Sequence, residues 1–156
     1  MATIHRFEDL VMFKKARELT KAVYTALAPC KDYGFRDQIQ RASVSIVSNI
    51  AEGFESGTKQ EFINYLYIAK ASAGEVRAQL YVANDIGYLN IETFKHLNMK
   101  AEECSRLIAS FIKKLKIGGL SGTQFKKESP RDLAGEMLSA AGYMRLPNGQ
   151  VVEKQI

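Results

Sequence analysis

The sequence of 156 residues predicts an all-α protein, an antiparallel four-helix bundle followed by a small C-terminal extension. Three observations lead to this fold class. Apolar residues recur every three or four positions through residues 8–115, which is the period of a helix with one buried face. Breaks at Pro29, Gly57 and Gly87 separate four such stretches. Four long helices joined by short loops bury their apolar faces by packing in up-down-up-down order.

The first helix is expected over residues 8–27 and the second over residues 35–54. Glu8 and Asp9 suit the positive end of the first helix dipole, and Pro29 follows its end. The inward faces expected for these two helices are Leu10, Phe13, Ala16, Val23 and Leu27 in the first, and Ile39, Ala42, Ile46, Ile50 and Gly53 in the second.

The third helix is expected to begin at Thr58 and to stop near Gly87, and the fourth to run from Asn90 to about residue 117. Thr58 and Glu61 form a capping-box pattern, in which each side chain satisfies the other residue's backbone N–H group. The fourth helix has apolar spacings of three and four, as in a coiled-coil seam. The expected inward faces are Phe62, Leu66, Ala69, Ala73, Val76, Leu80 and Ala83, then Phe94, Leu97, Ala101, Cys104, Ile108, Phe111 and Leu115.

A glycine-rich stretch at 118–122 divides the chain into a bundle at 1–117 and a linker with a C-terminal extension at 118–156. Ser129 and Pro130 are typical of a helix start, so a short helix is expected over residues 130–141. A hairpin is expected over 143–153, around the turn at 147–149. A lone short helix is marginal in water, so the extension is expected to dock on its own bundle or on a partner.

The composition is 46% hydrophobic and 25% charged, as in ordinary globular proteins. No apolar run approaches the roughly 18 residues of a membrane-spanning helix, so no membrane association is expected. The first residues contain no apolar stretch typical of a secretory signal. Two cysteines, Cys30 and Cys104, are too few for a disulfide scaffold. We therefore expect a cytoplasmic protein in which Cys104, on the apolar seam, is an inert core thiol.

The motifs that support catalysis or metal binding are missing from the sequence. The two histidines, His5 and His96, form no Glu-x-x-His pair of the kind that a di-iron bundle needs. No nucleophile motif or phosphate-binding glycine loop occurs. Glu52 and Glu75 are candidates for an acid/base pair, but a structural ion pair or a solvated position is favoured because no nucleophile accompanies them. We expect no enzyme, no metal and no cofactor.

The net charge of +5 lies mainly in the bundle, where 17 Lys and Arg residues face 13 Asp and Glu residues. A positive excess of this kind permits binding to RNA or DNA. For each lysine taken singly, a solvated position on a helix exterior is the competing explanation. The candidate contacts lie on one face of the first helix and at the end of the fourth: Lys14, Arg17 and Lys21, then Lys113, Lys114 and Lys116.

The second helix has an unusual number of small and polar residues for a core helix. Three explanations are open and do not exclude one another. Ala42, Ser43 and Gly53 permit a close approach of helices, or the polar residues contact another copy of the chain. The third explanation is a polar network across to Ser72, Glu75 and Gln79 on the third helix, which pairs Arg41 or Asn49 with Glu75. The residues expected in an interhelix or intersubunit network are Arg41, Asn49, Glu52, Glu75 and Gln79.

Four segments carry a resemblance to a known family: residues 7–10 (Phe-Glu-Asp-Leu), residues 38–53, which end in Asn-Ile-Ala-Glu-Gly, residues 62–80, and residues 87–89 (Gly-Tyr-Leu). Over residues 5–117 the chain resembles the bacterial four-helix-bundle proteins of 23S ribosomal RNA intervening sequences. It is also similar to the accessory variability determinant proteins of diversity-generating retroelements, which look like a branch of that family. Many relatives end soon after the fourth helix, so the extension is a departure.

The resemblance implies a ring-shaped homopentamer, which would carry a charge of about +25. For the retroelement branch it implies a non-catalytic protein that binds nucleic acid and a reverse transcriptase, whereas the role of the intervening-sequence branch is poorly defined. We therefore expect a nucleic-acid-binding adaptor. The alternative is an oligomeric scaffold that captures a protein partner through its C-terminal extension, with contacts at Leu133, Met137, Leu138 and Tyr143.

Overall fold

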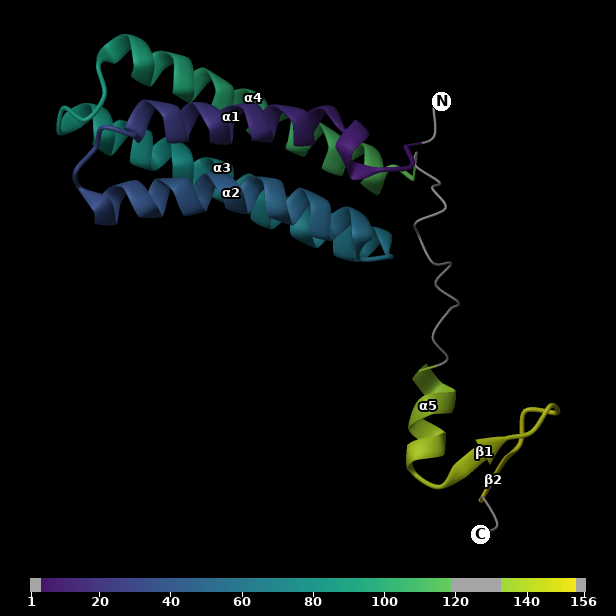
Figure 1. Ribbon diagram of the computed structural model, residues 1–156. Coiled ribbons are helices and arrows are strands. Elements are labelled where there is room, and N and C mark those ends of the chain that lie inside the picture. Colours follow the sequence, from purple (N-terminus) through teal and green to yellow (C-terminus); the bar gives the residue numbers. More distant parts are fainter. Residues whose placement is uncertain (1–3, 119–132, 154–156) are drawn as a thin grey trace. The chain divides into compact units, whose positions relative to one another are not determined.

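The computed structural model describes residues 4–118 and 133–153, except for the side chains of residues 133–136. The chain divides into two compact units, Met1–Lys126 and Lys127–Ile156. The first unit contains a short 3-10 helix, η1 (Phe7–Asp9), and four long helices (Figure 1). These helices are α1 (Val11–Leu27), α2 (Tyr33–Glu55), α3 (Lys59–Asp85) and α4 (Ile91–Lys116).

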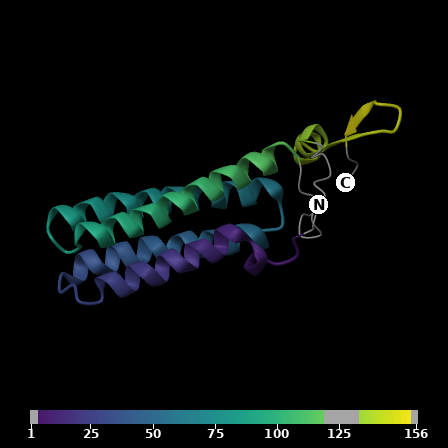
Figure 2. The ribbon, with the colours of Figure 1, turned by 90° about the horizontal axis from the view of Figure 1, so that it is seen from above.

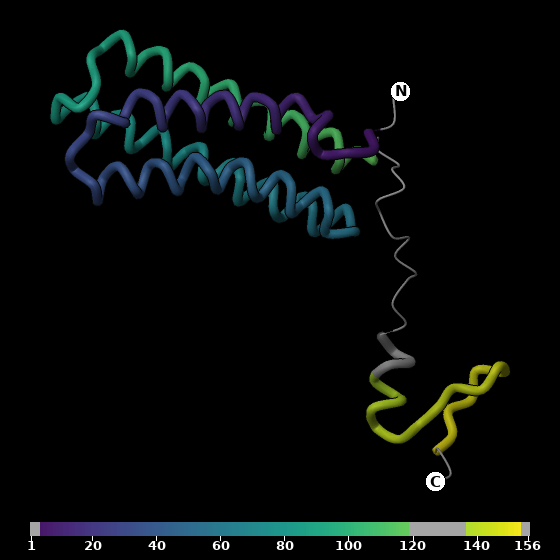
Figure 3. The backbone as a smooth tube through the Cα atoms, in the orientation of Figure 1, coloured from purple at the N-terminus to yellow at the C-terminus, as the bar shows by residue number. Residues whose placement is uncertain are grey.

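The four long helices form an antiparallel bundle. Helices α1 and α3 each contact both α2 and α4, so every helix has two neighbours. The connections lie at alternating ends of the bundle, which gives the up-down-up-down order (Figure 3). A view turned by 90° shows all four helices running alongside one another over their length (Figure 2). The predicted all-α bundle is confirmed.

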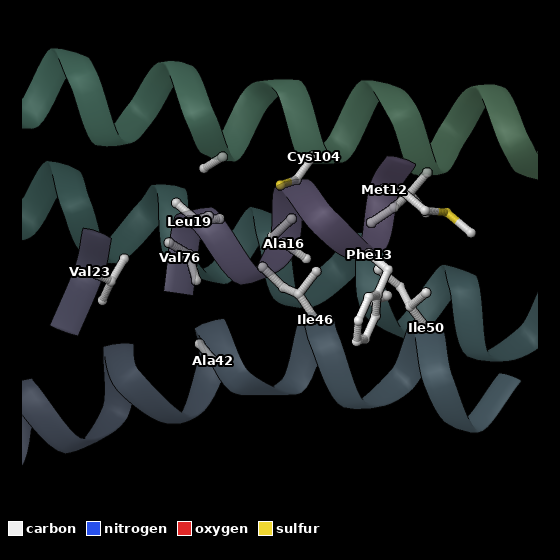
Figure 4. Close-up of a cluster of buried hydrophobic side chains, with 14 of the residues drawn as sticks. Met12, Phe13, Ala16, Leu19, Val23, Ala42, Ile46, Ile50, Val76 and Cys104 are labelled. Atoms are coloured by element: carbon white, nitrogen blue, oxygen red, sulfur yellow. The ribbon is translucent and has the colours of Figure 1, made fainter. Parts of the chain in front are cut away.

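The core is built from the predicted apolar faces. Figure 4 shows Leu19, Ile46, Val76 and Cys104, one from each long helix, pointing toward a common interior. All four side chains are fully buried. Near its C-terminus the seam of α4 departs from the prediction, because Ile112 is buried and Phe111 is only half-buried.

The first helix begins later than predicted. Phe7, Glu8 and Asp9 form η1, and the extended backbone of Leu10 separates this turn from α1. The side chain of Leu10 is buried in the core, which holds the chain in this extended conformation. Glu8 and Asp9 lie in the first turn of η1 instead of α1, and the Asp9 carboxylate accepts from the Arg6 guanidinium at 3.3 Å.

Polar side chains cap the later helices. The Thr58 hydroxyl accepts from the backbone N–H of Glu61 at 3.2 Å and donates to the Glu61 carboxylate at 2.9 Å. Half of the predicted capping box is therefore confirmed, while the carboxylate binds the hydroxyl instead of the backbone N–H of Thr58. Asp32 caps α2 through the N–H of Phe35, and Asn90 caps α4 in the same manner.

Helices α2 and α3 approach each other closely at Gly53. A Cβ atom at this position would lie 2.7 Å from the Cβ of Tyr65 and 2.9 Å from Cδ2 of Phe62. Farther along the interface, the hydroxyls of Ser45 and Ser72 form a hydrogen bond of 2.9 Å between the helices. The small and polar composition of α2 thus serves close packing at one position and an interhelix hydrogen bond at another.

The second unit contains a helix and a strand pair: α5 (Leu133–Ala140), β1 (Tyr143–Arg145) and β2 (Val151–Glu153). The strands are antiparallel, with Met144 opposite Val152. The backbone N–H of Gly149 donates to the carbonyl of Leu146 at 2.9 Å, and Gly149 has a φ of 88°, which closes the turn. Both strands lie within the predicted hairpin, whereas residues 130–132 of the predicted helix lie outside the described residues.

Candidate nucleic-acid interface

Three cations of α1 lie in a row along the groove between α1 and α2. Lys14, Arg17 and Lys21 are spaced by three and four residues, which places them on one side of the helix. All three are exposed and line a groove of about 700 Å³. The structure therefore brings the predicted basic residues of α1 together at one surface.

The floor of this groove is apolar. Tyr24 of α1 and Val44 of α2 line it and remain 44% and 40% exposed, and Val47 lies half-buried beside them. The wall is fixed by Thr20, whose hydroxyl donates to the carbonyl of Ser43 across the two helices at 3.0 Å. The groove thus combines cations with exposed apolar side chains on two helices that are joined by a hydrogen bond.

The charge of the groove is positive because its one carboxylate is already engaged. Glu18 lines the groove, and its Oε2 lies 3.3 Å from the Nζ of Lys15 and 3.7 Å from that of Lys100. Among the residues that the structure describes, no ion pair within 4 Å involves Lys14, Arg17 or Lys21, although, after the hydrogen bond from Arg6, the charge of Lys14 contributes to lowering the pKa of Asp9. The Arg17 guanidinium instead lies 6.0 Å from the centre of the Phe13 ring. These three cations are available to an anionic ligand.

The second basic cluster ends α4. Lys113, Lys114 and Lys116 lie in the last turn, where the negative end of the helix dipole favours cations. The Nζ of Lys116 donates to the Tyr67 hydroxyl at 2.7 Å and lies 5.1 Å from the centre of that ring. Lys114 lines a separate groove of about 290 Å³ beside the start of α1. The two basic clusters therefore do not share a groove.

The sequence profile described as 23S rRNA-intervening sequence protein matches residues 8–110. The chain belongs to this family. The fold is also found in a crystal structure from Bacteroides thetaiotaomicron VPI-5482, described as a protein with unknown function from the S23 ribosomal protein family. That chain is 29% identical, with a TM-score of 0.63, and the match covers 66% of this chain and 99% of that one. No curated protein matches the sequence.

Membership of the 23S rRNA-intervening sequence protein family confirms the broader part of the resemblance seen in the sequence. The relation to the accessory variability determinant proteins stays a prediction. The matched segment ends before the last turn of α4 and excludes the C-terminal extension, so the extension of this family member has no counterpart in the match.

The polar residues of α2 and α3 are placed differently from the prediction in this family member. Among the described residues, Arg41 pairs with Asp37 of its own helix at 2.8 Å, and Asn49 donates to the carbonyl of Ser45. The predicted pairing of either residue with Glu75 is therefore not formed, and Glu75 instead accepts from Gln79 at 3.3 Å. Local partners four residues away replace Glu75, whereas the predicted link to Ser72 is formed: Asn49 also donates to the Ser45 hydroxyl, which bonds to Ser72 of α3. Glu52 is exposed on α2.

The predicted partner-docking residues lie in the second unit. Met137 is 74% exposed, Leu138 is half-buried and Tyr143 is exposed. The side chain of Leu133 lies outside the described residues.

Three other predictions concern metal binding, the Cys104 thiol and membrane-spanning helices. Within the described residues, no group of three or more His, Cys, Asp or Glu side chains is placed to hold a metal ion. Burial raises the pKa of the Cys104 thiol to about 12, so the prediction of a protected core thiol is confirmed. None of the described helices combines the length and the apolar character that crossing a bilayer requires.

Sequence reasoning missed the groove floor and one loop contact. Tyr24 follows Lys21 by three residues and so continues the row of Lys14, Arg17 and Lys21, a signal that was available in the sequence. Val44 and Val47 gave no such signal, because their position depends on the packing of α2 against α1. The other missed contact joins two loops: the Tyr88 hydroxyl donates to the Asp32 carboxylate at 2.8 Å.

Proposed function

We propose that this protein is a cytoplasmic, non-catalytic adaptor that binds RNA or DNA and works as a ring-shaped homopentamer. The observation that carries the proposal is the row of Lys14, Arg17 and Lys21 along a groove whose one carboxylate is engaged elsewhere. Cations without carboxylate partners are suited to phosphate groups, which dominate the affinity of proteins for nucleic acid. Lys113 and Lys114 add positive charge at the end of α4.

The outer face of α3 supports the oligomeric part of the proposal. Most surface helices are apolar on one side, but α3 has a second apolar row facing solvent. Its large members, Tyr67, Ile68, Tyr81 and Val82, are each about half exposed. An exposed apolar patch on a helix is typical of a contact surface between proteins. We propose that a second copy of the chain covers this face.

Light scattering on the full chain tests the oligomer. We expect a mass of about five chains, and Val82→Glu, which places a charge on the apolar face, is expected to reduce it. A chain that is monomeric at micromolar concentration would refute the ring. The matched control is Met99→Glu on α4, which makes the same change of charge at an exposed apolar residue of a different helix.

Binding is tested by fluorescence anisotropy with labelled RNA and DNA oligonucleotides over a range of salt concentrations. If three cations contact three phosphates, each subunit contributes about −2 for single strands, or about −3 for duplexes, to the slope of the log of the association constant against the log of the salt concentration. The triple variant Lys14→Ala, Arg17→Ala, Lys21→Ala is expected to remove this part of the slope and to weaken binding at all sequences.

The control for that experiment removes three lysines elsewhere on the bundle: Lys59→Ala, Lys70→Ala, Lys95→Ala. These residues are exposed on α3 and α4, and the variant lowers the net charge by the same amount. An unmeasurable affinity of the wild-type protein at low salt, or equal losses in the two triple variants, would contradict the proposal.

The partner that the resemblance implies is a reverse transcriptase of a diversity-generating retroelement, which we include in the proposal. It is tested by co-purification of the protein with a reverse transcriptase encoded beside it. If the gene lies in a 23S ribosomal RNA intervening sequence instead, the retroelement part is wrong and the nucleic-acid part is unaffected.

A second candidate function is an oligomeric scaffold that captures a protein partner through the C-terminal extension. It is favoured by the apolar side chains that the second unit leaves in contact with solvent, above all Met137 and Met144. Deleting residues 119–156 distinguishes the two functions. Nucleic-acid binding is expected to survive the deletion if the bundle carries it, whereas capture of a protein partner is expected to fail.

A further inference from the structure

We infer that the groove between α1 and α2 takes single-stranded nucleic acid, with an unpaired base against Tyr24 and the phosphates along Lys14, Arg17 and Lys21. This inference rests on the proposed function and names the ligand class of the same site. The geometry of the row is the first argument. Residues 14, 17, 21 and 24 follow one side of α1 in steps of three, four and three, so the aromatic ring stands at the end of the cations.

The apolar floor is the second argument. A phosphate backbone gains nothing from Val44 and Val47, because charged oxygens lose hydration against an apolar surface. The face of a base is apolar and planar, and it gains by stacking on an aromatic ring. In a duplex the base faces are covered by their neighbours, so only an unpaired nucleotide presents this surface.

The third argument is that the groove is already in order before a ligand binds. The Thr20 hydroxyl lies 2.9 Å from the carbonyl of Ala16 and 3.0 Å from that of Ser43, which ties α1 to α2 beneath the cations. Phe13, beside the Arg17 guanidinium, is buried in the core. Fixed walls lower the entropy cost of binding.

Charge complementarity favours a nucleic acid strand over a second copy of the chain as the occupant. The rim of the groove is cationic and its one carboxylate is held by Lys15 and Lys100. The outer face of α3, by contrast, supplies the carboxylates of Glu75 and Asp85 at separate positions among apolar and small residues. A strand with one phosphate per nucleotide matches the row of three cations better.

The test uses the full chain and four labelled probes: oligo-uridine RNA, oligo-thymidine DNA, and a blunt RNA duplex and DNA duplex of the same length. The wild-type protein is expected to bind the single strands more tightly than the duplexes. Tyr24→Leu is expected to weaken single-strand binding about 5- to 150-fold, the range found when one stacking side chain is removed. Duplex binding is expected to change less than twofold, and Tyr24→Phe is expected to retain the wild-type affinity.

The matched control is Tyr143→Leu in the second unit, which removes a tyrosine of similar exposure, 42% against 44% for Tyr24. It is expected to leave all four affinities unchanged. Circular dichroism and light scattering of each variant record its helix content and mass, so that a loss of folding is recognised. Equal affinities for the RNA and the DNA single strands support both as ligands. A higher affinity for one of the two identifies that strand as the ligand.

Three outcomes overturn the inference. If duplexes bind as tightly as single strands and Tyr24→Leu changes neither, the ligand class is wrong while the proposed function stands. If Tyr24→Leu changes the oligomeric mass and not the single-strand affinity, a second copy covers the groove. If the wild-type protein binds none of the four probes, the proposed function fails and the inference fails with it.

Discussion

Replacing Gly53 by alanine tests whether α2 and α3 approach as closely as the structure places them. The new Cβ would lie 2.7 Å from the Cβ of Tyr65, against about 3.5–4.0 Å for two carbon atoms in contact. No side-chain rotation relieves this, because a Cβ atom is fixed to its backbone. The Phe62 ring, 2.9 Å away, is itself held between Phe54 and Phe111.

The sign of the effect depends on two opposing contributions. Alanine is favoured over glycine inside a helix by about 1 kcal/mol. Overpacking a tight interface costs about 1–3 kcal/mol, and the absence of a flexible neighbour places Gly53→Ala in the upper part of this range. We expect a net loss of about 1–2 kcal/mol in the free energy of unfolding, which lowers Tm by about 5–10 °C for a bundle of this size.

Thermal and urea unfolding followed by circular dichroism measure this loss. The matched control is Gly74→Ala on the exposed side of α3, where a Cβ would meet nothing within 4 Å. This variant gains the higher helix propensity of alanine without a steric clash, and it is expected to raise the free energy of unfolding by about 1 kcal/mol. Both variants are compared at one protein concentration. If Gly53→Ala is as stable as Gly74→Ala, the close approach of α2 and α3 is wrong.

Three further predictions concern single groups. Iodoacetamide at pH 8 is expected to modify Cys30 and not Cys104, because burial raises the pKa of the Cys104 thiol to about 12. Mass spectrometry of the native protein detects the adducts. Rapid modification of both thiols would contradict the buried position of Cys104. The backbone N–H of Phe35 lowers the pKa of Asp32 below its ordinary 3.8, and the Tyr88 hydroxyl lowers it further. The stability from ionised Asp32 is therefore present above pH 3.8 and lost as the pH falls through the folded-state value, so the Tm advantage over Asp32→Asn is expected to shrink on acidification. Thr58→Ala is expected to cost about 1 kcal/mol in urea unfolding through loss of a helix cap, and Thr58→Ser is expected to restore it.

Much of the fold follows from local sequence patterns, and the errors have local physical causes. The seam of α4 was expected to pass through Phe111 to Leu115, but an α-helix has 3.6 residues per turn and drifts against a strict three-four repeat. At the fifth step from Phe94 the inward position has moved from Phe111 to Ile112, while Leu115 is buried as predicted. The break at Leu10 was missed because the burial of that side chain, and not the helix propensity of the segment, sets the backbone there.

The candidate site could be predicted only where it lies on one helix. The row of Lys14, Arg17 and Lys21 follows from the spacing along α1, whereas Val44 enters the groove through the packing of α2 against α1. Long-range polar pairs were the least predictable. One explanation paired Arg41 or Asn49 with Glu75 on another helix, but Asp37 lies one turn from Arg41 on the same helix, so this pair forms without additional ordering of the chain.

The up-down order of the helices also has a consequence for how the chain folds. Three of the four interfaces join helices that follow each other in the sequence, and each of these pairs forms by closing a short loop. The contact of α1 with α4 alone joins segments that are far apart in the chain. Contacts of this kind are formed late, because their loop-closure entropy is lost before the packing energy is gained. Docking of α1 on α4 is thus the step that completes the bundle. The groove between α1 and α2 needs only the contact of these two helices, so it can form before that step.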